Sequence, residues 1–198
     1  DAVPTSTTFS VGDEFDFSPD GRELVYTATP TSAREEAWST NHDLYAVNLE
    51  TGERRQITTN PAADSSPRYS PDGKYIAYRA QSRPGFEADR WQLMLYERAT
   101  GQRRSLTEAL DSWVEGYVWG PDSKELFLEA EEKGQKPIWS VSIDGGPPED
   151  LGLALEGVWP YGLSVHPDGR RIVFSAGSPI REDLWVLPDV AAAARNAR

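Results

Sequence analysis

The sequence has no cysteine, one methionine and two histidines among its 198 residues. Without cysteine there are no disulfide bonds, thiol nucleophiles or thiolate metal sites. His42 and His166 are too few for a histidine-rich metal centre, so we expect neither a metal nor another cofactor. No apolar run approaches the roughly 20 residues that a membrane-spanning helix needs.

Positive charge is also scarce. The chain has 20 lysines and arginines against 32 aspartates and glutamates, which gives a net charge of −12. Such a chain is not attracted electrostatically to nucleic acid or to an anionic membrane, so we expect neither as a partner. The chain starts at Asp1 without methionine or a signal segment, and we expect a mature, processed or excised piece. Periplasmic, secreted and cytoplasmic locations are all compatible with the sequence.

What the sequence does contain is a repeated turn. The segment "YSPDGKYIAYRA" at 69–80 recurs as "FSPDGRELVYTA" at 17–28, "WGPDSKELFLEA" at 119–130 and "VHPDGRRIVFSA" at 165–176. Proline presets φ, aspartate caps the turn and glycine accepts a positive φ, which favours a tight turn before a strand of period two. Counted from Ser18 through Ser70 and Gly120 to His166, the spacings are 52, 50 and 46 residues.

Each repeat continues with a second strand-like run. These runs are "HDLYAVNLE", "WQLMLYERA", "PIWSVSIDG" and "EDLWVLPDV", and the first two lead through a glycine turn to "RRQIT" and "RRSLT". Four short antiparallel strands in about 45 residues are typical of a β-propeller blade. We therefore predict an all-β chain, a single β-propeller over 1–190 with four four-stranded blades. Their bounds are about 11–58, 59–107, 108–152 and 153–190, followed by a tail at 191–198.

The fourth repeat has no visible fourth strand. We expect residues 1–10 to supply it and so close the last blade; the alternative is a disordered N-terminal lead-in. Four blades are few, because propellers have about four to eight. A four-bladed ring, a homodimer that forms an eight-bladed ring, and an arc of a larger propeller all remain open.

Loop lengths predict one binding face. The turns after the first and third strands of a blade are tight and lie on one face, whereas the other connections are long, for example 29–42, 81–90 and 153–161. Loops held by a rigid scaffold often carry binding residues. We expect a peptide or another protein domain to bind on the long-loop face.

Catalytic motifs are missing from the sequence. No G-x-S-x-G nucleophile elbow occurs, and "SAGSP" at 175–179 does not have that pattern. Asp72 and its equivalents recur with the blades, so we interpret them as turn residues, and His166 replaces the serine of the turn. We predict no catalytic residue, and therefore no enzyme activity, in this chain.

One loop carries a candidate ligand site. In "REEAW" at 34–38, the paired carboxylates of Glu35 and Glu36 lie beside Trp38, and together they could hold a cationic group such as a peptide N-terminus. The alternative is that both glutamates are simply solvated.

Longer segments resemble a known family. The stretches "SPDGKYIAYRAQSRPGFEADRWQLMLYERATGQRRSLTE" and "VWGPDSKELFLEAEEKG" resemble the propeller of prolyl-oligopeptidase-family serine peptidases, in the dipeptidyl- and acylaminoacyl-peptidase branch. The resemblance covers about residues 11–145, and the last repeat is more similar to TolB-like (PD40-type) propellers. It implies a propeller that covers an active site, filters substrates by size and, in dipeptidyl peptidases, supplies acidic groups for the substrate amine.

Three functional hypotheses follow. The first is a non-catalytic binding or scaffold module that resembles the substrate-gating propeller of a serine peptidase. The second is the propeller part of an active serine peptidase whose hydrolase domain is absent from this chain. The third is an engineered, chimeric or fragment propeller without a ligand, which includes the homodimer with eight blades.

Overall fold

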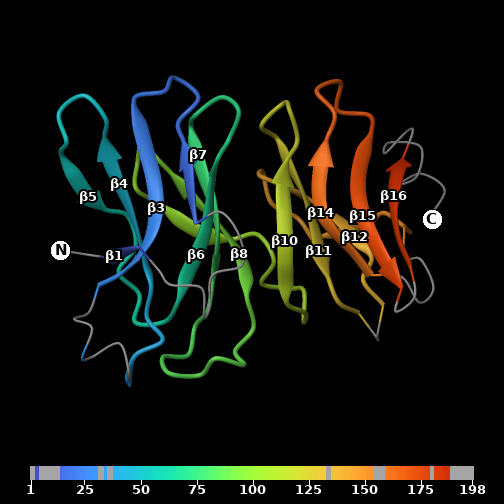
Figure 1. The fold of residues 1–198 in the computed structure, drawn as a ribbon, viewed down its shortest axis with the longest axis horizontal. Helices are drawn as coiled ribbons and strands as arrows, with labels where there is room; N and C mark the ends of the chain where they lie inside the picture. Colours follow the sequence, from blue (N-terminus) through green and yellow to red (C-terminus); the bar gives the residue numbers. More distant parts are fainter. Residues whose placement is uncertain are drawn as a thin grey trace. The chain divides into compact units, whose positions relative to one another are not determined.

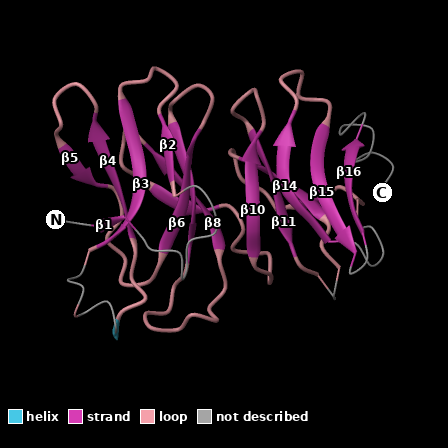
Figure 2. Cartoon of the chain, in the orientation of Figure 1, coloured by secondary structure: helices cyan, strands magenta, loops and turns pink. Residues whose placement is uncertain are grey.

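The computed structural model describes residues 3–4, 14–30, 34, 38–132, 135–153, 159–178 and 181–187. Apart from one residue of 3₁₀ conformation at Trp38, the regular secondary structure over these ranges consists of β-strands (Figure 2). Over the same ranges there is no long apolar helix of the kind that crosses a membrane. The chain divides into two compact units, Asp1–Ser105 and Leu106–Arg198, which we describe separately.

The first unit holds two antiparallel sheets (Figure 1). The first sheet contains β1 (Val3–Pro4), β2 (Phe15–Phe17), β3 (Glu23–Thr29), β4 (Asp43–Asn48) and β5 (Arg54–Gln56). The second sheet contains β6 (Asp64–Tyr69), β7 (Tyr75–Ala80), β8 (Gln92–Glu97) and β9 (Arg103–Ser105) in sequence order. This order is the up-and-down pattern that the repeat predicts.

The second unit also holds two antiparallel sheets. The third sheet contains β10 (Val114–Trp119), β11 (Glu125–Ala130), β12 (Ile138–Ser142) and β13 (Glu149–Asp150). The fourth contains β14 (Trp159–Val165), β15 (Ile172–Ser178) and β16 (Arg181–Leu187), three strands among the described residues. The prediction of an all-β chain with four antiparallel blades is confirmed.

The described part of the N-terminal segment pairs within the first sheet. Val3 pairs with Thr29 and Pro4 pairs with Ala28, so β1 extends the edge of β3 that also holds β2. These two residues therefore belong to the first sheet, and closure of the last blade by the N-terminal segment stays a prediction. Residues 5–10 and the predicted tail at 191–198 lie outside the described residues.

The repeated turns form as their residues predict. In the second repeat, the Ser70 hydroxyl donates to Asp72 Oδ1 at 2.7 Å and accepts the amide hydrogen of Tyr75 at 3.0 Å. Gly73 has a φ of 71°. In the third repeat, Ser123 stands in the glycine position and takes a φ of 63°, a conformation that strains a residue with a Cβ. The aspartates of these turns are therefore structural.

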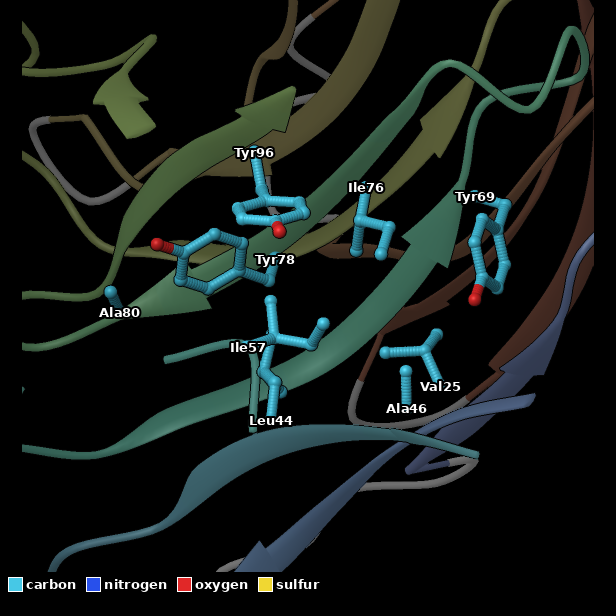
Figure 3. Packing of buried hydrophobic residues seen from close by; sticks show 9 residues of the cluster. All are labelled: Val25, Leu44, Ala46, Ile57, Tyr69, Ile76, Tyr78, Ala80 and Tyr96. Carbon is cyan, nitrogen blue, oxygen red and sulfur yellow. The ribbon is translucent and has the colours of Figure 1, made fainter. Parts of the chain in front are cut away.

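Apolar side chains fill the space between the two sheets of the first unit (Figure 3). The cluster consists of Val25, Leu44, Ala46 and Ile57 from the first sheet and its following loop, and Tyr69, Ile76, Tyr78, Ala80 and Tyr96 from the second. A similar cluster lies within the second unit, built from Phe127, Ile138, Leu151, Ile172 and Phe174. Burial of such side chains is the main stabilising contribution in a sheet-on-sheet arrangement.

An ionic cluster also joins the two sheets of the first unit, near the tight turns. Glu23 accepts hydrogen bonds from the Tyr69 hydroxyl at 2.5 Å, from Arg55 at 2.9 Å and from Arg98 at 3.0 Å. The Arg98 guanidinium also lies over the Tyr69 ring, 5.0 Å from its centroid. Because Glu23 and Arg55 come from the first sheet and the other two from the second, these bonds hold the sheets in register.

Candidate binding face of the first unit

The long connections of the first unit share one end of its sheets. They are the segments 30–42, 57–63 and 81–91, which join β3 to β4, β5 to β6 and β7 to β8. Antiparallel pairing places these three connections together and places the tight turns at the opposite end. In Figure 1 the long loops lie at the lower end of this unit. The loops are thus positioned by two rigid sheets, as the sequence predicts.

The loop at 81–91 is held by internal hydrogen bonds. Asp89 Oδ2 accepts the amide hydrogens of Ser82 and Arg83, both at 2.8 Å, and the Ser82 hydroxyl at 3.0 Å. Gln81 Nε2 donates to the backbone carbonyls of Glu87 at 3.0 Å and Asp89 at 2.8 Å. Burial by itself would raise the pKa of Asp89, but the hydrogen bonds outweigh it, so the pKa lies below its ordinary value. The carboxylate therefore stays charged and fixes the loop.

The loops of the two sheets are joined at their tips. The Gly85 amide donates to Thr40 Oγ1 at 3.1 Å, and Gly85 has a φ of 71° that suits glycine. Next to these residues lie two exposed aromatic side chains, Trp38, which is 88% exposed, and Phe86. The Arg83 guanidinium lies 5.7 Å from the centroid of the Phe86 ring. Aromatic faces and a cation thus lie on adjoining loops.

The structure covers only part of the predicted ligand site. Trp38 is described and exposed, whereas Glu35 and Glu36 lie outside the described residues. The pairing of two carboxylates with an aromatic ring therefore stays a prediction. Phe86 and Arg83 were not predicted from the sequence. They flank a Pro-Gly turn in a long loop, and this position could have marked them as candidate site residues.

A buried polar layer lies at this same end of the sheets. Asp43 and Asp64 are both buried, each at the start of a strand that follows a long loop. Thr58 Oγ1 donates to Asp43 Oδ1 at 3.3 Å and accepts the amide hydrogen of Leu44 at 2.9 Å. Asn60 Nδ2 donates to Asp64 Oδ1 at 2.6 Å. This layer ties the loop at 57–63 to both sheets.

Burial shifts the proton affinity of both acids. It raises the pKa of Asp64 to about 7, with the negative charge of Asp43 adding to the effect and the hydrogen bonds from Thr58 and Asn60 opposing it. Burial also raises the pKa of Asp43, against hydrogen bonds from Thr58 and Gln56. Neither residue was predicted from the sequence, although each begins a strand directly after a long loop.

The second unit has a buried acid of its own. Glu129 of β11 is buried, and burial together with the charge of Glu115 raises its pKa to about 7. A Cβ at position 116 would lie 3.3 Å from Glu129 Oε2, so Gly116 leaves room for this carboxyl. Lys136 forms an ion pair with Glu115. A positive charge thus already accompanies these two carboxyl groups.

The histidines have structural surroundings. His166 Nδ1 accepts the amide hydrogen of Asp168 at 3.2 Å inside the fourth turn, in the place that serine occupies in the first two repeats. The His42 carbonyl accepts the amide hydrogen of Asp64 at 2.8 Å. Within the described ranges, no group of three or more His, Cys, Asp or Glu side chains is arranged to hold a metal.

Comparison with known proteins identifies relatives of two kinds. The family model for the TolB β-propeller domain, PD40, matches residues 14–187. Dipeptidyl-peptidase 5 of Porphyromonas gingivalis is 32% identical over 135 residues, which are 68% of this chain and 20% of that protein. Dipeptidyl-peptidase 5 of Schizosaccharomyces pombe is 30% identical over 131 residues, 65% of this chain and 19% of that protein. The matched region thus spans about a fifth of these relatives.

Solved structures with the same fold include a TolB and a peptidase. A TolB from Agrobacterium tumefaciens superposes with a TM-score of 0.69 at 19% identity, covering 94% of this chain and 64% of that one. A puromycin-hydrolyzing peptidase from Mycobacterium tuberculosis superposes with a TM-score of 0.68 at 19% identity, covering 87% of this chain and 29% of that one. At this identity the likeness concerns the fold.

Proposed function

The chain belongs to the TolB-type PD40 β-propeller family, and from this premise we propose that it is a non-catalytic binding module for peptide segments. The observation that carries the proposal is the pair of adjoining loops that expose Trp38 and Phe86 on a rigid scaffold. Exposed aromatic side chains beside a cation are frequent anchors of protein and peptide ligands. The ligand side is the long-loop end of the first unit.

The kinship with peptidases supports a role beside substrate handling. The relatives named dipeptidyl-peptidase 5 match about two thirds of this chain. Residues 11–145 also resemble the substrate-gating propeller of prolyl-oligopeptidase-family enzymes. In such a role the propeller binds and orients peptides while the chemistry takes place on another domain. We assign the peptide class to this chain on that basis, together with the aromatic loops.

Binding measurements on loop variants test the proposal. A set of fluorescently labelled peptides that differ in N-terminal and apolar residues is titrated with the chain and with Trp38→Ala and Phe86→Ala. We expect at least one peptide to bind and each substitution to weaken it about tenfold, which is about 1.4 kcal/mol. The unfolding transition of Trp38→Ala should stay unchanged, because Trp38 is almost fully exposed.

A matched control lies in the second unit. Trp113 is also exposed, and Trp113→Ala should leave peptide affinity as in the unsubstituted chain. If Trp38→Ala and Phe86→Ala bind peptide as well as the control does, the long-loop end of the first unit is not the ligand side.

An active peptidase is the second candidate, and the names of the relatives favour it. A serine-directed fluorophosphonate probe separates the two functions. We expect no labelled serine in this chain, because its sequence lacks a nucleophile elbow. A serine labelled in proportion to peptide turnover would overturn the non-catalytic proposal.

A further inference from the structure

Aspartate is followed directly by glycine at four places in the sequence. The pairs are Asp20–Gly21, Asp72–Gly73, Asp144–Gly145 and Asp168–Gly169. In such a pair the aspartate side chain can react with its own backbone, because glycine has no Cβ to shield its amide nitrogen. The reaction needs a carboxyl group that can turn towards this nitrogen and an amide that is not held elsewhere. The four pairs differ in both respects.

Three of the carboxylates are held by the repeated Pro-Asp-Gly turn. Asp72 accepts the Ser70 hydroxyl at 2.7 Å and the Lys74 amide hydrogen at 3.1 Å. Its other oxygen pairs with the Lys74 ammonium group at 2.9 Å. Asp20 and Asp168 likewise accept the amide hydrogen of the residue two positions later, at 3.1 and 2.9 Å. Breaking a hydrogen bond to a charged group costs free energy, so each bond opposes rotation of the carboxylate.

The same bonds keep these carboxyl groups ionised. The amide hydrogen of Arg170 and the Arg171 guanidinium lower the pKa of Asp168 to about 2. The Ser18 hydroxyl lowers the pKa of Asp20 in the same way. Ring closure expels the hydroxyl group of a neutral carboxyl, so an ionised carboxylate is the less reactive form.

Asp144 lies in a different kind of turn, between β12 and β13. Its carboxylate forms no hydrogen bond or ion pair with the part of the chain that the structure describes. The Gly145 amide donates to the Ser142 carbonyl at 3.3 Å, whereas the glycine amides of the three other pairs donate at 2.8 Å. A Cβ at Gly145 or Gly146 would meet no described atom within 4 Å, so the turn has room for a ring. Both reacting groups are therefore less restrained here.

We propose that Asp144 is a site of spontaneous isoaspartate formation. The Gly145 nitrogen attacks Cγ of Asp144, a nitrogen–carbon bond forms, and the amide proton and the carboxyl hydroxyl leave as water. Water then opens the five-membered imide at either carbonyl. Opening at Cγ restores aspartate. Opening at the backbone carbonyl leaves a free α-carboxylate and directs the main chain through the side chain, which adds one methylene group to the turn.

Peptide mapping of the aged chain tests the site. Cleavage after glutamate places the four pairs on separate peptides, 15–23, 54–87, 133–149 and 157–182. After incubation at neutral pH, protein isoaspartate methyltransferase reports the modified carboxylates, and chromatography separates the modified peptides from unmodified peptides of equal mass. We expect isoaspartate to accumulate at least about tenfold faster in the peptide with Asp144 than in the other three, a factor equivalent to about 1.4 kcal/mol in activation free energy.

Variants and an unfolded sample separate the effect of the fold from that of the sequence. Asp144→Glu should abolish the signal at this turn, because glutamate has to close a six-membered ring, which forms more slowly. Ser70→Ala removes a hydroxyl that holds Asp72 and should speed isoaspartate formation there. Circular dichroism confirms that both variants are folded. In guanidinium chloride, where the turns are lost, the four rates should converge.

The rates in the folded chain decide the outcome. Equal rates at the four pairs, or a faster rate at Asp72 than at Asp144, would overturn the proposal. So would the absence of isoaspartate at Asp144 in the folded chain when the unfolded sample forms it. An unchanged rate at Asp72 in folded Ser70→Ala would contradict the protection assigned to the turn.

Discussion

Replacement of Asp64 by asparagine should remove a pH dependence from the stability of the first unit. Asp64 is buried, and its pKa is raised from 3.8 to about 7. The native chain therefore holds a proton there that the unfolded chain releases. The stability contributed by that proton is present in full below pH 3.8 and is lost as pH rises through about 7.

The magnitude follows from the size of the rise in pKa. Between 3.8 and about 7, at about 1.4 kcal/mol for each pKa unit, the loss amounts to about 4 kcal/mol. This figure is an upper bound, because Asp43 is buried in the same polar layer, its pKa is also raised and the pair shares its protons. Asparagine keeps the shape and an oxygen that can accept from Asn60, but it does not titrate. Between about pH 5 and about pH 8 its curve should therefore be flatter by up to about 3 kcal/mol, the part of the loss that lies above about pH 5.

Urea unfolding over a series of buffers between about pH 5 and about pH 8 measures the effect as the free energy of unfolding at each pH. We expect the unsubstituted chain to lose stability across this range and Asp64→Asn to lose less. Glu129 has a raised pKa of its own and contributes a slope of the same sign, so Asp64→Asn/Glu129→Gln should be flatter still.

Asp72 provides a control of opposite sign. Burial would raise its pKa, but hydrogen bonds from Ser70 and Lys74 outweigh it, so the pKa of this turn carboxylate is lowered. Its contribution is present above pH 3.8 and is lost as pH falls through the lowered value, outside the measured range. Asp72→Asn should therefore leave the slope between about pH 5 and about pH 8 unchanged. An equal slope in Asp64→Asn and the unsubstituted chain would refute the reasoning.

Two further substitutions test the packing. Glu23→Gln leaves Arg98 and Arg55 without their carboxylate. We expect the free energy of unfolding, measured by urea titration, to fall by about 2 kcal/mol. A loss that does not shrink at high salt would contradict an ionic origin. Gly120→Ser introduces the serine of the first two turns, yet its Cβ would lie 2.9 Å from Glu125 Cγ. We expect it to destabilise the chain by about 1 kcal/mol in thermal unfolding, and a higher melting temperature would show that Glu125 moves aside without cost.

Much of the fold could be predicted because its signals are local. The turn at Ser70 needs only proline, aspartate and glycine in order, and the strands that follow need only alternation. The pairing of Val3 and Pro4 could not be predicted, since a two-residue ladder carries no pattern that distinguishes one sheet edge from another. Closure of the last blade by the N-terminal segment stays a prediction.

The sequence predicted where the candidate site lies but not all of the residues that form it. Loop lengths located the end of the sheets that carries the long connections, and Trp38 was named as a candidate site residue. Phe86 joined it only through the contact between Gly85 and Thr40, which lie 45 residues apart. Contacts between loops of different sheets leave no periodic trace in a sequence.

The sequence by itself determined the number of sheets, their strand order and the face that carries long loops, because turn chemistry and side-chain alternation act between near neighbours. Tertiary structure decided what each position does. Phe17 and Tyr69 occupy the same place in the repeat, yet Phe17 is exposed whereas Tyr69 is buried in the cluster that the first sheet forms with the second. Asp64 is an ordinary acid in the sequence, and its raised pKa arises from burial beside Asp43. Exposure and proton affinity depend on what surrounds a residue in space, and distant parts of the chain supply those surroundings.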